Sequence, residues 1–195
     1  RMAEAMGELH EADIRLELQE GYPPVINTPG EVTLVRKCVR ELYGPDGRHA
    51  PIDGSLEAIA RLNQGGYTVV VASNQSGIAR GYFDIETLTA MHQKMAALLE
   101  KLGGHVDAIF YCPHGPKDNC DCRKPKPGML LEIGQRFNVS LEDVVFIGDS
   151  MADIKAAANA NARSVLVRTG KGERAEKILK AENRDDIPVF DDLAA

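Results

Sequence analysis

Three cysteines and one histidine stand close together in the stretch 112–122. They follow the spacing C-x-H-x5-C-x-C, as Cys112, His114, Cys120 and Cys122. Thiolates and imidazoles are the usual ligands of zinc, and four protein ligands close a tetrahedral site that keeps no open position for water. The spacing therefore predicts a structural zinc site that holds a loop rich in proline, glycine and charge. The alternative is a chance cluster of free thiols. Cys38 is expected to be an ordinary thiol.

Two cations follow the last of these cysteines directly. Arg123 can bind a phosphate or a diol through two N–H groups, and Lys124 supplies a point charge. An isolated Arg-Lys pair would be a solvated basic turn. Because this pair continues a loop that a metal would hold, the sequence favours an anion-binding role.

A polar turn follows the apolar run Tyr67–Ala72. It consists of Ser73, Asn74, Gln75, Ser76 and Gly77. Hydroxyl, amide and backbone N–H groups of such a turn can converge on phosphate oxygens. The alternative is a hydrophilic turn that only caps the next helix.

A carboxylate follows a second apolar run, Val144–Ile147. The segment reads Gly148-Asp149-Ser150, with Asp153 one helical turn further on. A carboxylate at the tip of a buried strand can hold Mg²⁺, which takes one or two carboxylates, water and phosphate oxygens. An N-cap aspartate is the alternative, and the two aspartates can divide these roles.

The elements that position these residues alternate along the chain. Apolar periodicity and capping residues predict helices over 55–62, 85–102, 128–137 and 151–160. Strands are expected over 67–72, 106–111, 144–147 and 164–167, with a further helix over 1–20 and a short strand over 32–35. Such alternation predicts an α/β sheet of parallel strands, whose chemistry lies beyond the carboxyl ends of the strands.

Composition narrows the classes of function. A chain of 195 residues with 44% hydrophobic residues is expected to fold as one globular domain. The net charge of −6 argues against a non-specific nucleic-acid binder. We expect no membrane partner, because no run reaches the roughly 20 apolar residues of a membrane span. Without a signal-peptide pattern, a cytoplasmic protein with reduced thiols is expected. A monomer is expected, although no sequence feature indicates the oligomeric state.

Four motifs occur in one order: SNQSGIARG (73–81), CPHGPKDNCDCRKPKPGM (112–129), GDSMAD (148–153) and VLVRTGKG (165–172). Together they resemble the D-glycero-D-manno-heptose 1,7-bisphosphate phosphatases of the haloacid dehalogenase superfamily. The histidinol-phosphate phosphatases, which are related, share the zinc loop. The resemblance covers Pro51 to Gly172.

The resemblance implies a three-layer Rossmann-like fold and Mg²⁺-dependent hydrolysis of a phosphate ester through an aspartyl-phosphate. The implied substrate is a sugar bisphosphate, which loses its 7-phosphate during synthesis of lipopolysaccharide precursors. By motif, Ser73 binds the transferring phosphate, Lys124 is the phosphate-binding lysine and Asp149 ligates Mg²⁺. The remaining positions match substrate contacts: Asn74, Gln75, Ser76, Arg123 and Ser150. In some relatives the position of Ser150 is a lysine. The zinc ligands of the family match Cys112, His114, Cys120 and Cys122.

The first motif of the family is missing. The family opens with a strand that ends in Asp-x-Asp-Gly, in which the first aspartate is the nucleophile and the second the general acid and base. No Asp-x-Asp precedes Pro51, and the run Val32–Cys38 puts Arg36 and Cys38 in place of the carboxylates. Without a carboxylate nucleophile no covalent intermediate forms. Such a loss typically costs several orders of magnitude in rate.

We therefore divide the chain into an atypical segment, 1–50, and a phosphatase domain, 51–195. Three explanations compete, in this order. Residues 1–50 are a misread or rearranged start of an ordinary phosphatase gene, or they are a true divergence, or a carboxylate from an unexpected place, with Asp46 and Asp53 as candidates, fills the site. We expect weak activity or none. The alternative functions are a sugar-phosphate-binding pseudo-phosphatase, a histidinol-phosphate phosphatase and, from another class, a redox or zinc sensor.

Overall fold

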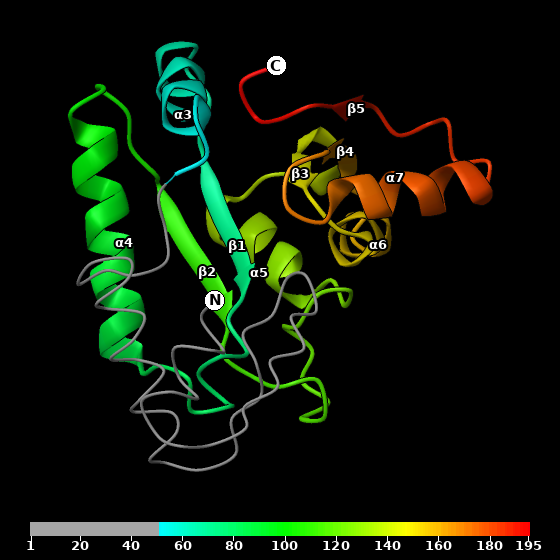
Figure 1. Cartoon of the computed structure of the whole chain (residues 1–195), viewed down its shortest axis with the longest axis horizontal. Coiled ribbons are helices and arrows are strands. Elements are labelled where there is room, and N and C mark those ends of the chain that lie inside the picture. The colour runs from blue at the N-terminus through cyan, green and yellow to red at the C-terminus, as the bar shows by residue number, and fades with distance from the viewer. Residues whose placement is uncertain (1–50) are drawn as a thin grey trace, which may run out of the picture. The chain divides into compact units, whose positions relative to one another are not determined.

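Helices and strands alternate along residues 51–195, the part of the chain that the computed structural model describes (Figure 1). In chain order the elements are α3 (Ser55–Gln64), β1 (Val70–Asn74), α4 (Ile85–Glu100), β2 (Ala108–Cys112), α5 (Gly128–Phe137), η1 (Leu141–Asp143), β3 (Val145–Gly148), α6 (Met151–Asn159), β4 (Arg163–Val167), α7 (Gly172–Ala181) and β5 (Val189–Phe190). The four helices and four strands expected between residues 55 and 167 are confirmed. The helix expected over 1–20 and the strand expected over 32–35 lie outside the described residues.

Strand β1 is displaced toward the C-terminus from its predicted position. It spans Val70–Asn74 instead of 67–72, so Ser73 and Asn74 are its last two residues and do not form the turn after it. The reason is tertiary, because the parallel ladder with β2 continues through Ser73 and Asn74. Pairing with a neighbour outweighs the low strand preference of these side chains.

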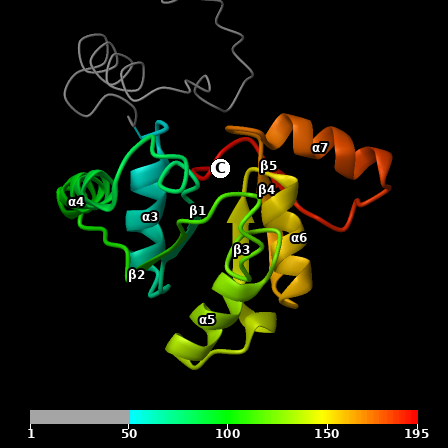
Figure 2. The same ribbon diagram turned by 90° about the horizontal axis from the view of Figure 1, so that it is seen from below.

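The strands are parallel, as the sequence predicts, and within residues 51–195 they lie in two sheets. One sheet has the order β1–β2 and the other the order β3–β4–β5. Figure 2 shows α3 and α4 beside the first sheet and α6 and α7 beside the second. Helix α7 and strand β5 extend the alternation beyond the predicted elements.

Helix α5 packs against both sheets. Its Met129 lies in a buried cluster with Phe110 of β2. Its Leu130 lies in a second cluster with Ala156 of α6, against which Phe146 of β3 packs. A third cluster joins the second sheet to α6 and α7 through Ile154, Leu166, Ala175, Leu179 and Ile187. The loop that precedes α5 is therefore held where the two sheets approach each other.

The described helices include none that is long and apolar enough to cross a membrane.

Candidate active site and metal centre

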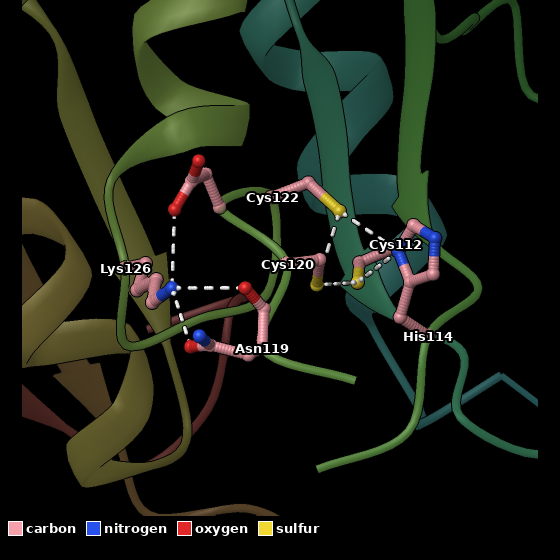
Figure 3. A network of polar contacts seen from close by, with 7 residues as sticks. Cys112, His114, Asn119, Cys120, Cys122 and Lys126 are labelled. Atoms are coloured by element: carbon pink, nitrogen blue, oxygen red, sulfur yellow. Dashed lines mark hydrogen bonds and ion pairs between the residues drawn. The ribbon is translucent and has the colours of Figure 1, made fainter. Parts of the chain in front are cut away.

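The four predicted zinc ligands come together at the end of β2 (Figure 3). Cys112 is the last residue of β2, and the other three lie in the loop that leads to α5. The Sγ atom of Cys120 lies 3.5 Å from that of Cys112 and 3.6 Å from that of Cys122. Nδ1 of His114 lies 3.6 Å from Sγ of Cys112 and 3.3 Å from Sγ of Cys122. All four ligand atoms lie within 4.8 Å of one another.

This geometry fits a zinc ion. A tetrahedron with zinc–sulfur bonds of about 2.3 Å has edges of about 3.8 Å, close to the separations of the ligand atoms. Without a metal, burial raises the pKa of the Cys112 thiol and raises that of Cys122 to about 12. A cation at the centre reverses this effect, since it stabilises thiolates directly. The four residues would therefore hold zinc with the cysteines as thiolates, each giving up its proton when the metal binds, as in structural sites.

The zinc loop is also braced by polar contacts of its own. Nζ of Lys126 donates to the backbone oxygen of Asn119 at 3.4 Å, to its Oδ1 at 3.2 Å and to Oδ1 of Asp121 at 3.1 Å (Figure 3). At the start of α5 the backbone of Gly128 lies directly against the backbone of Asp121. A Cβ at Gly128 would overlap the carbonyl oxygen of Asp121. Glycine is therefore required where this loop enters α5.

Both cations after the zinc loop are tied to the site. Nη1 of Arg123 donates to the carbonyl oxygen of His114 at 3.2 Å, so a zinc ligand and the guanidinium are directly connected. Nζ of Lys124 lies 2.6 Å from Oδ1 of Asp153 and donates to the carbonyl oxygen of Ala72 at 2.6 Å. The Lys124 side chain is only 11% exposed and sits above the ring of Phe146, 5.3 Å from its centroid.

Asn74 holds the backbone of Lys124. Its Nδ2 donates to the carbonyl oxygen of Lys124 at 3.0 Å, and its Oδ1 accepts from the N–H of Lys124 at 3.1 Å. The sequence predicts Asn74 as a substrate contact. In the structure both polar groups of its side chain already bond to the protein, which makes Asn74 a positioning residue for Lys124.

Gln75 and Ser76 follow directly after β1. Nε2 of Gln75 donates to Oγ of Ser73 at 3.2 Å, and the N–H of Gln75 donates to the carbonyl oxygen of Cys112 at 2.8 Å. Ser76 is buried. The predicted phosphate-binding turn and the zinc loop are thus connected through the backbone of Cys112.

Asp149 and Asp153 lie beyond the carboxyl end of β3. Oδ2 of Asp149 accepts from the N–H of Lys171 at 3.1 Å, and a Cβ at Gly170 would overlap the same oxygen. Asp153 is 5% exposed and accepts from Oγ of Ser150 at 2.5 Å. The carboxylate oxygens suit a hard cation such as Mg²⁺.

The sequence predicts Asp153 only as the residue that shares the roles of Mg²⁺ ligand and helix N-cap with Asp149. The structure brings it against Lys124, and the signal that could have found it is its place one helical turn after Asp149. Of the two substitute carboxylates weighed from the sequence, Asp53 is exposed in the turn before α3, and Asp46 lies outside the described residues.

Comparisons with known proteins identify the family of this chain. A family model described as HAD-hydrolase-like matches residues 121–195. A D-glycero-beta-D-manno-heptose-1,7-bisphosphate 7-phosphatase from Pseudomonas aeruginosa is 54% identical over 145 residues, which are 74% of this chain and 80% of that protein. The enzyme of the same name from Neisseria meningitidis is 46% identical over 143 residues, 73% of this chain and 76% of that protein.

Two solved structures of heptose 1,7-bisphosphate phosphatases are also similar to this chain. The D,D-heptose 1,7-bisphosphate phosphatase from B. bronchiseptica, solved in complex with magnesium and phosphate, superposes with a TM-score of 0.69 at 51% identity, covering 74% of this chain and 79% of that chain. The corresponding phosphatase from Burkholderia thailandensis gives a TM-score of 0.59 at 43% identity, covering 75% and 83%. This chain belongs to the D-glycero-beta-D-manno-heptose-1,7-bisphosphate 7-phosphatase family of HAD-like hydrolases.

Proposed function

We propose that residues 51–195 form the phosphate-binding part of a Mg²⁺-dependent phosphatase that acts on the 7-phosphate of D-glycero-D-manno-heptose 1,7-bisphosphate. The observation that carries the proposal is the placement of Lys124. Its ammonium group lies 2.6 Å from Asp153, in the first turn of α6, and 2.6 Å from the carbonyl oxygen of Ala72 in β1. The names of the relatives and of the solved structures support the substrate.

Each residue contributes a distinct interaction. Lys124 neutralises charge on a phosphoryl group, and Asn74 fixes where its backbone lies. Ser73 offers a hydroxyl near the end of β1. Arg123 orients the rest of the sugar phosphate from the zinc loop. Bound at Asp149, Mg²⁺ would offset negative charge on the phosphate.

Catalysis also needs a nucleophile. The carboxylates that the structure places at Lys124 and at the end of β3 are Asp153 and Asp149, and both are already engaged. An Asp-x-Asp is absent from residues 1–50. The chain alone is therefore expected to bind the sugar bisphosphate and to hydrolyse it slowly or not at all.

The test is phosphate release from heptose 1,7-bisphosphate by zinc-loaded chain with Mg²⁺. Asp149→Asn is the control, because it removes the proposed metal ligand and keeps the side-chain volume. Slow release that disappears in the control supports the proposal. Turnover as fast as in the relatives would show that an unrecognised carboxylate completes the site.

A second candidate is a binding module that holds a sugar phosphate without hydrolysing it. The missing nucleophile favours this function. A ligand that binds only the folded state raises the apparent stability. A rise in the melting temperature with heptose bisphosphate, with no phosphate released, would select the binding module. A stronger rise with histidinol phosphate would change the proposed substrate.

The cellular context belongs to the same proposal. We place the chain in the cytoplasm, since the zinc site needs reduced thiols and reducing compartments keep them. A monomer is expected, and analytical ultracentrifugation tests that.

A further inference from the structure

The turn between β4 and α7 holds the carboxylate of Asp149. The N–H of Lys171 donates to Oδ2 of Asp149 at 3.1 Å. Gly170 stands directly before Lys171 with a φ of +61°, and a Cβ at this position would overlap the same carboxylate oxygen. A φ in this region favours glycine, which has no Cβ to collide with its surroundings. The backbone of the turn therefore lies closer to Asp149 than a residue with a side chain at position 170 would allow.

The turn is itself fixed by its neighbours. The N–H of Arg168, just after β4, donates to the carbonyl oxygen of Phe190 in β5 at 2.9 Å. The guanidinium of Arg168 donates to both carboxylate oxygens of Glu176 in α7, at 2.8 and 3.0 Å. Because the turn is tied both to a strand and to a helix, it resists following Asp149 when that side chain moves. The N–H of Lys171 is therefore a donor in a fixed position.

Asp149 keeps one oxygen for a cation at this end of β3. Asp153 uses both of its oxygens, since Oδ1 pairs with Lys124 at 2.6 Å and Oδ2 accepts from Ser150 at 2.5 Å. Oδ2 of Asp149 accepts from Lys171, which leaves Oδ1. Of the carboxylate oxygens of these two aspartates, residues 51–195 therefore leave Oδ1 of Asp149 for a metal ion.

The number of available oxygens matters because Mg²⁺ and Ca²⁺ use carboxylates differently. Mg²⁺ demands near-octahedral geometry with oxygens at about 2.0–2.1 Å, and the narrow angle between the two oxygens of one carboxylate does not fit an octahedron. Ca²⁺ is larger, accepts about six to eight oxygens and binds carboxylates through one oxygen or both. A hydrogen bond to Oδ2 is compatible with binding through one oxygen and competes with binding through two.

We propose that the backbone N–H of Lys171, which approaches Asp149 because residue 170 is glycine, determines which cation the site accepts. By engaging Oδ2 it limits Asp149 to binding through one oxygen, and this selects Mg²⁺ against Ca²⁺. The inference rests on the proposed function, in which Asp149 ligates Mg²⁺. It goes further, because it assigns the choice of cation to a backbone group of a different loop, in which the side chain of Lys171 takes no part.

Competition between metals tests the proposal. Full-length, zinc-loaded chain is titrated with Mn²⁺, and the free ion is followed by electron paramagnetic resonance. Mn²⁺ suits the same carboxylate, carbonyl and water ligands as Mg²⁺ and Ca²⁺. Bound Mn²⁺ is then displaced by Mg²⁺ or by Ca²⁺, and the two displacement curves give the ratio of their affinities. Binding that disappears in Asp149→Asn belongs to this site.

Matched variants of Lys171 separate the backbone from the side chain. Lys171→Pro deletes the N–H and should shift the ratio of affinities about tenfold toward Ca²⁺, because Asp149 can then offer both oxygens. Lys171→Ala is the control, since it removes the side chain, keeps the N–H and should leave the ratio unchanged. Thermal melting shows whether both variants fold. A purely structural role of the turn would weaken the binding of both cations equally and would not change the ratio.

Hydrogen exchange provides a second measurement on the wild-type chain. With Mg²⁺ the amide proton of Lys171 should stay protected, because Oδ2 still accepts it. With Ca²⁺ at the same saturation this proton should exchange several-fold faster, since a cation that draws in Oδ2 breaks the bond. The amide of Arg168, which donates to Phe190, is the internal control and should exchange equally with both cations.

The outcomes distinguish this inference from the proposed function. If Asp149→Asn binds Mn²⁺ as tightly as the wild type, Asp149 is not a metal ligand, and both the proposed magnesium site and this inference are wrong. If Asp149→Asn abolishes binding but Lys171→Pro leaves the ratio unchanged, the magnesium site stands and this inference alone is wrong. Equal protection of the Lys171 amide by both cations would also overturn it. This exchange result decides the question if Lys171→Pro does not fold.

Discussion

Lys124 is the residue at which the parts of the site meet. It follows the zinc loop, its backbone is held by Asn74 of β1, and its ammonium group contacts the carbonyl oxygen of Ala72 and the carboxylate of Asp153. A single cation is thus fixed by β1 of one sheet and by α6, the helix that follows β3 of the other. Its position, more than its charge, distinguishes it from a solvated lysine, because a preorganised donor costs no reorganisation when phosphate binds.

The first prediction concerns Asn74. Asn74→Ala removes two hydrogen bonds to the Lys124 backbone, each contributing about 1 kcal/mol, and should weaken Mg²⁺-dependent phosphate binding about tenfold. Isothermal calorimetry with inorganic phosphate measures this. Asn63→Ala is the matched control, because Asn63 also bonds to backbone groups through both polar atoms, at Tyr67 and His105. If both variants bind phosphate equally well, Asn74 has no positioning role.

The second prediction concerns the pair of Lys124 with Asp153, whose side chains are 11% and 7% exposed. Lys124→Met leaves the Asp153 carboxylate without its charge partner and should lower the free energy of unfolding by about 3 kcal/mol. Urea denaturation measures this. Adding Asp153→Asn should recover part of the loss, because the unpaired charge is then gone. If Asp153→Asn lowers the free energy of unfolding as much in the Lys124→Met background as it does alone, the two side chains are not coupled.

At the scale of elements, the zinc loop positions the cations because β2 and α5 fix its two ends. Cys112 is the fully buried end of β2, and Gly128 begins α5 against the backbone of Asp121. Between them, the backbone oxygen of His114 accepts from Arg123. A metal bound by the Cys/His cluster would therefore order both the loop between β2 and α5 and the Arg123 side chain that bonds to it.

The third prediction is that the loop depends on the metal. Cys120→Ser should lose the bound zinc, melt at a lower temperature and bind phosphate less tightly, because the loop then lacks a core of its own. Metal analysis, calorimetry and thermal melting measure the three effects. Cys38→Ser is the control, since Cys38 is expected to be an ordinary thiol. Zinc content that falls equally in both variants would contradict the assignment of ligands.

At the scale of the whole described domain, one ion-pair network joins three elements of the C-terminal half. Arg168, just after β4, donates to both carboxylate oxygens of Glu176 in α7, at 2.8 and 3.0 Å, and to Asp191 after β5 at 2.6 Å. Lys180 pairs with Glu176 one turn further along α7. These bonds, from Arg168 first and Lys180 second, lower the pKa of Glu176 from 4.5 to about 2.

The fourth prediction follows from this pKa. A carboxylate whose pKa is lower in the folded state contributes stability above its unfolded pKa and loses it as the pH falls through its folded pKa. The difference in unfolding free energy between wild type and Glu176→Gln should therefore be largest above pH 4.5 and shrink toward pH 2. Denaturation at a series of pH values measures it. Glu173→Gln, at an exposed position in the first turn of α7, is the matched control variant. A constant difference for Glu176→Gln would contradict the network.

The Cys/His cluster, the alternation of helices and strands between residues 55 and 167, and the family could be predicted from the sequence alone. The reason is that all three are local patterns. The ligand spacing lies within 112–122, the helices follow apolar periodicity, and the family motifs are short runs of fixed order.

Other features were decided only by tertiary structure. The end of β1 depends on its ladder with β2, which carries Ser73 and Asn74 into the strand. The roles of Asn74 and Asp153 depend on contacts with Lys124 across 50 and 29 positions of the chain. Within residues 51–195, the division into a β1–β2 sheet and a β3–β4–β5 sheet depends on which strands pair with each other. Local sequence encodes what each segment prefers, whereas hydrogen bonds between distant segments exist only after the chain has folded.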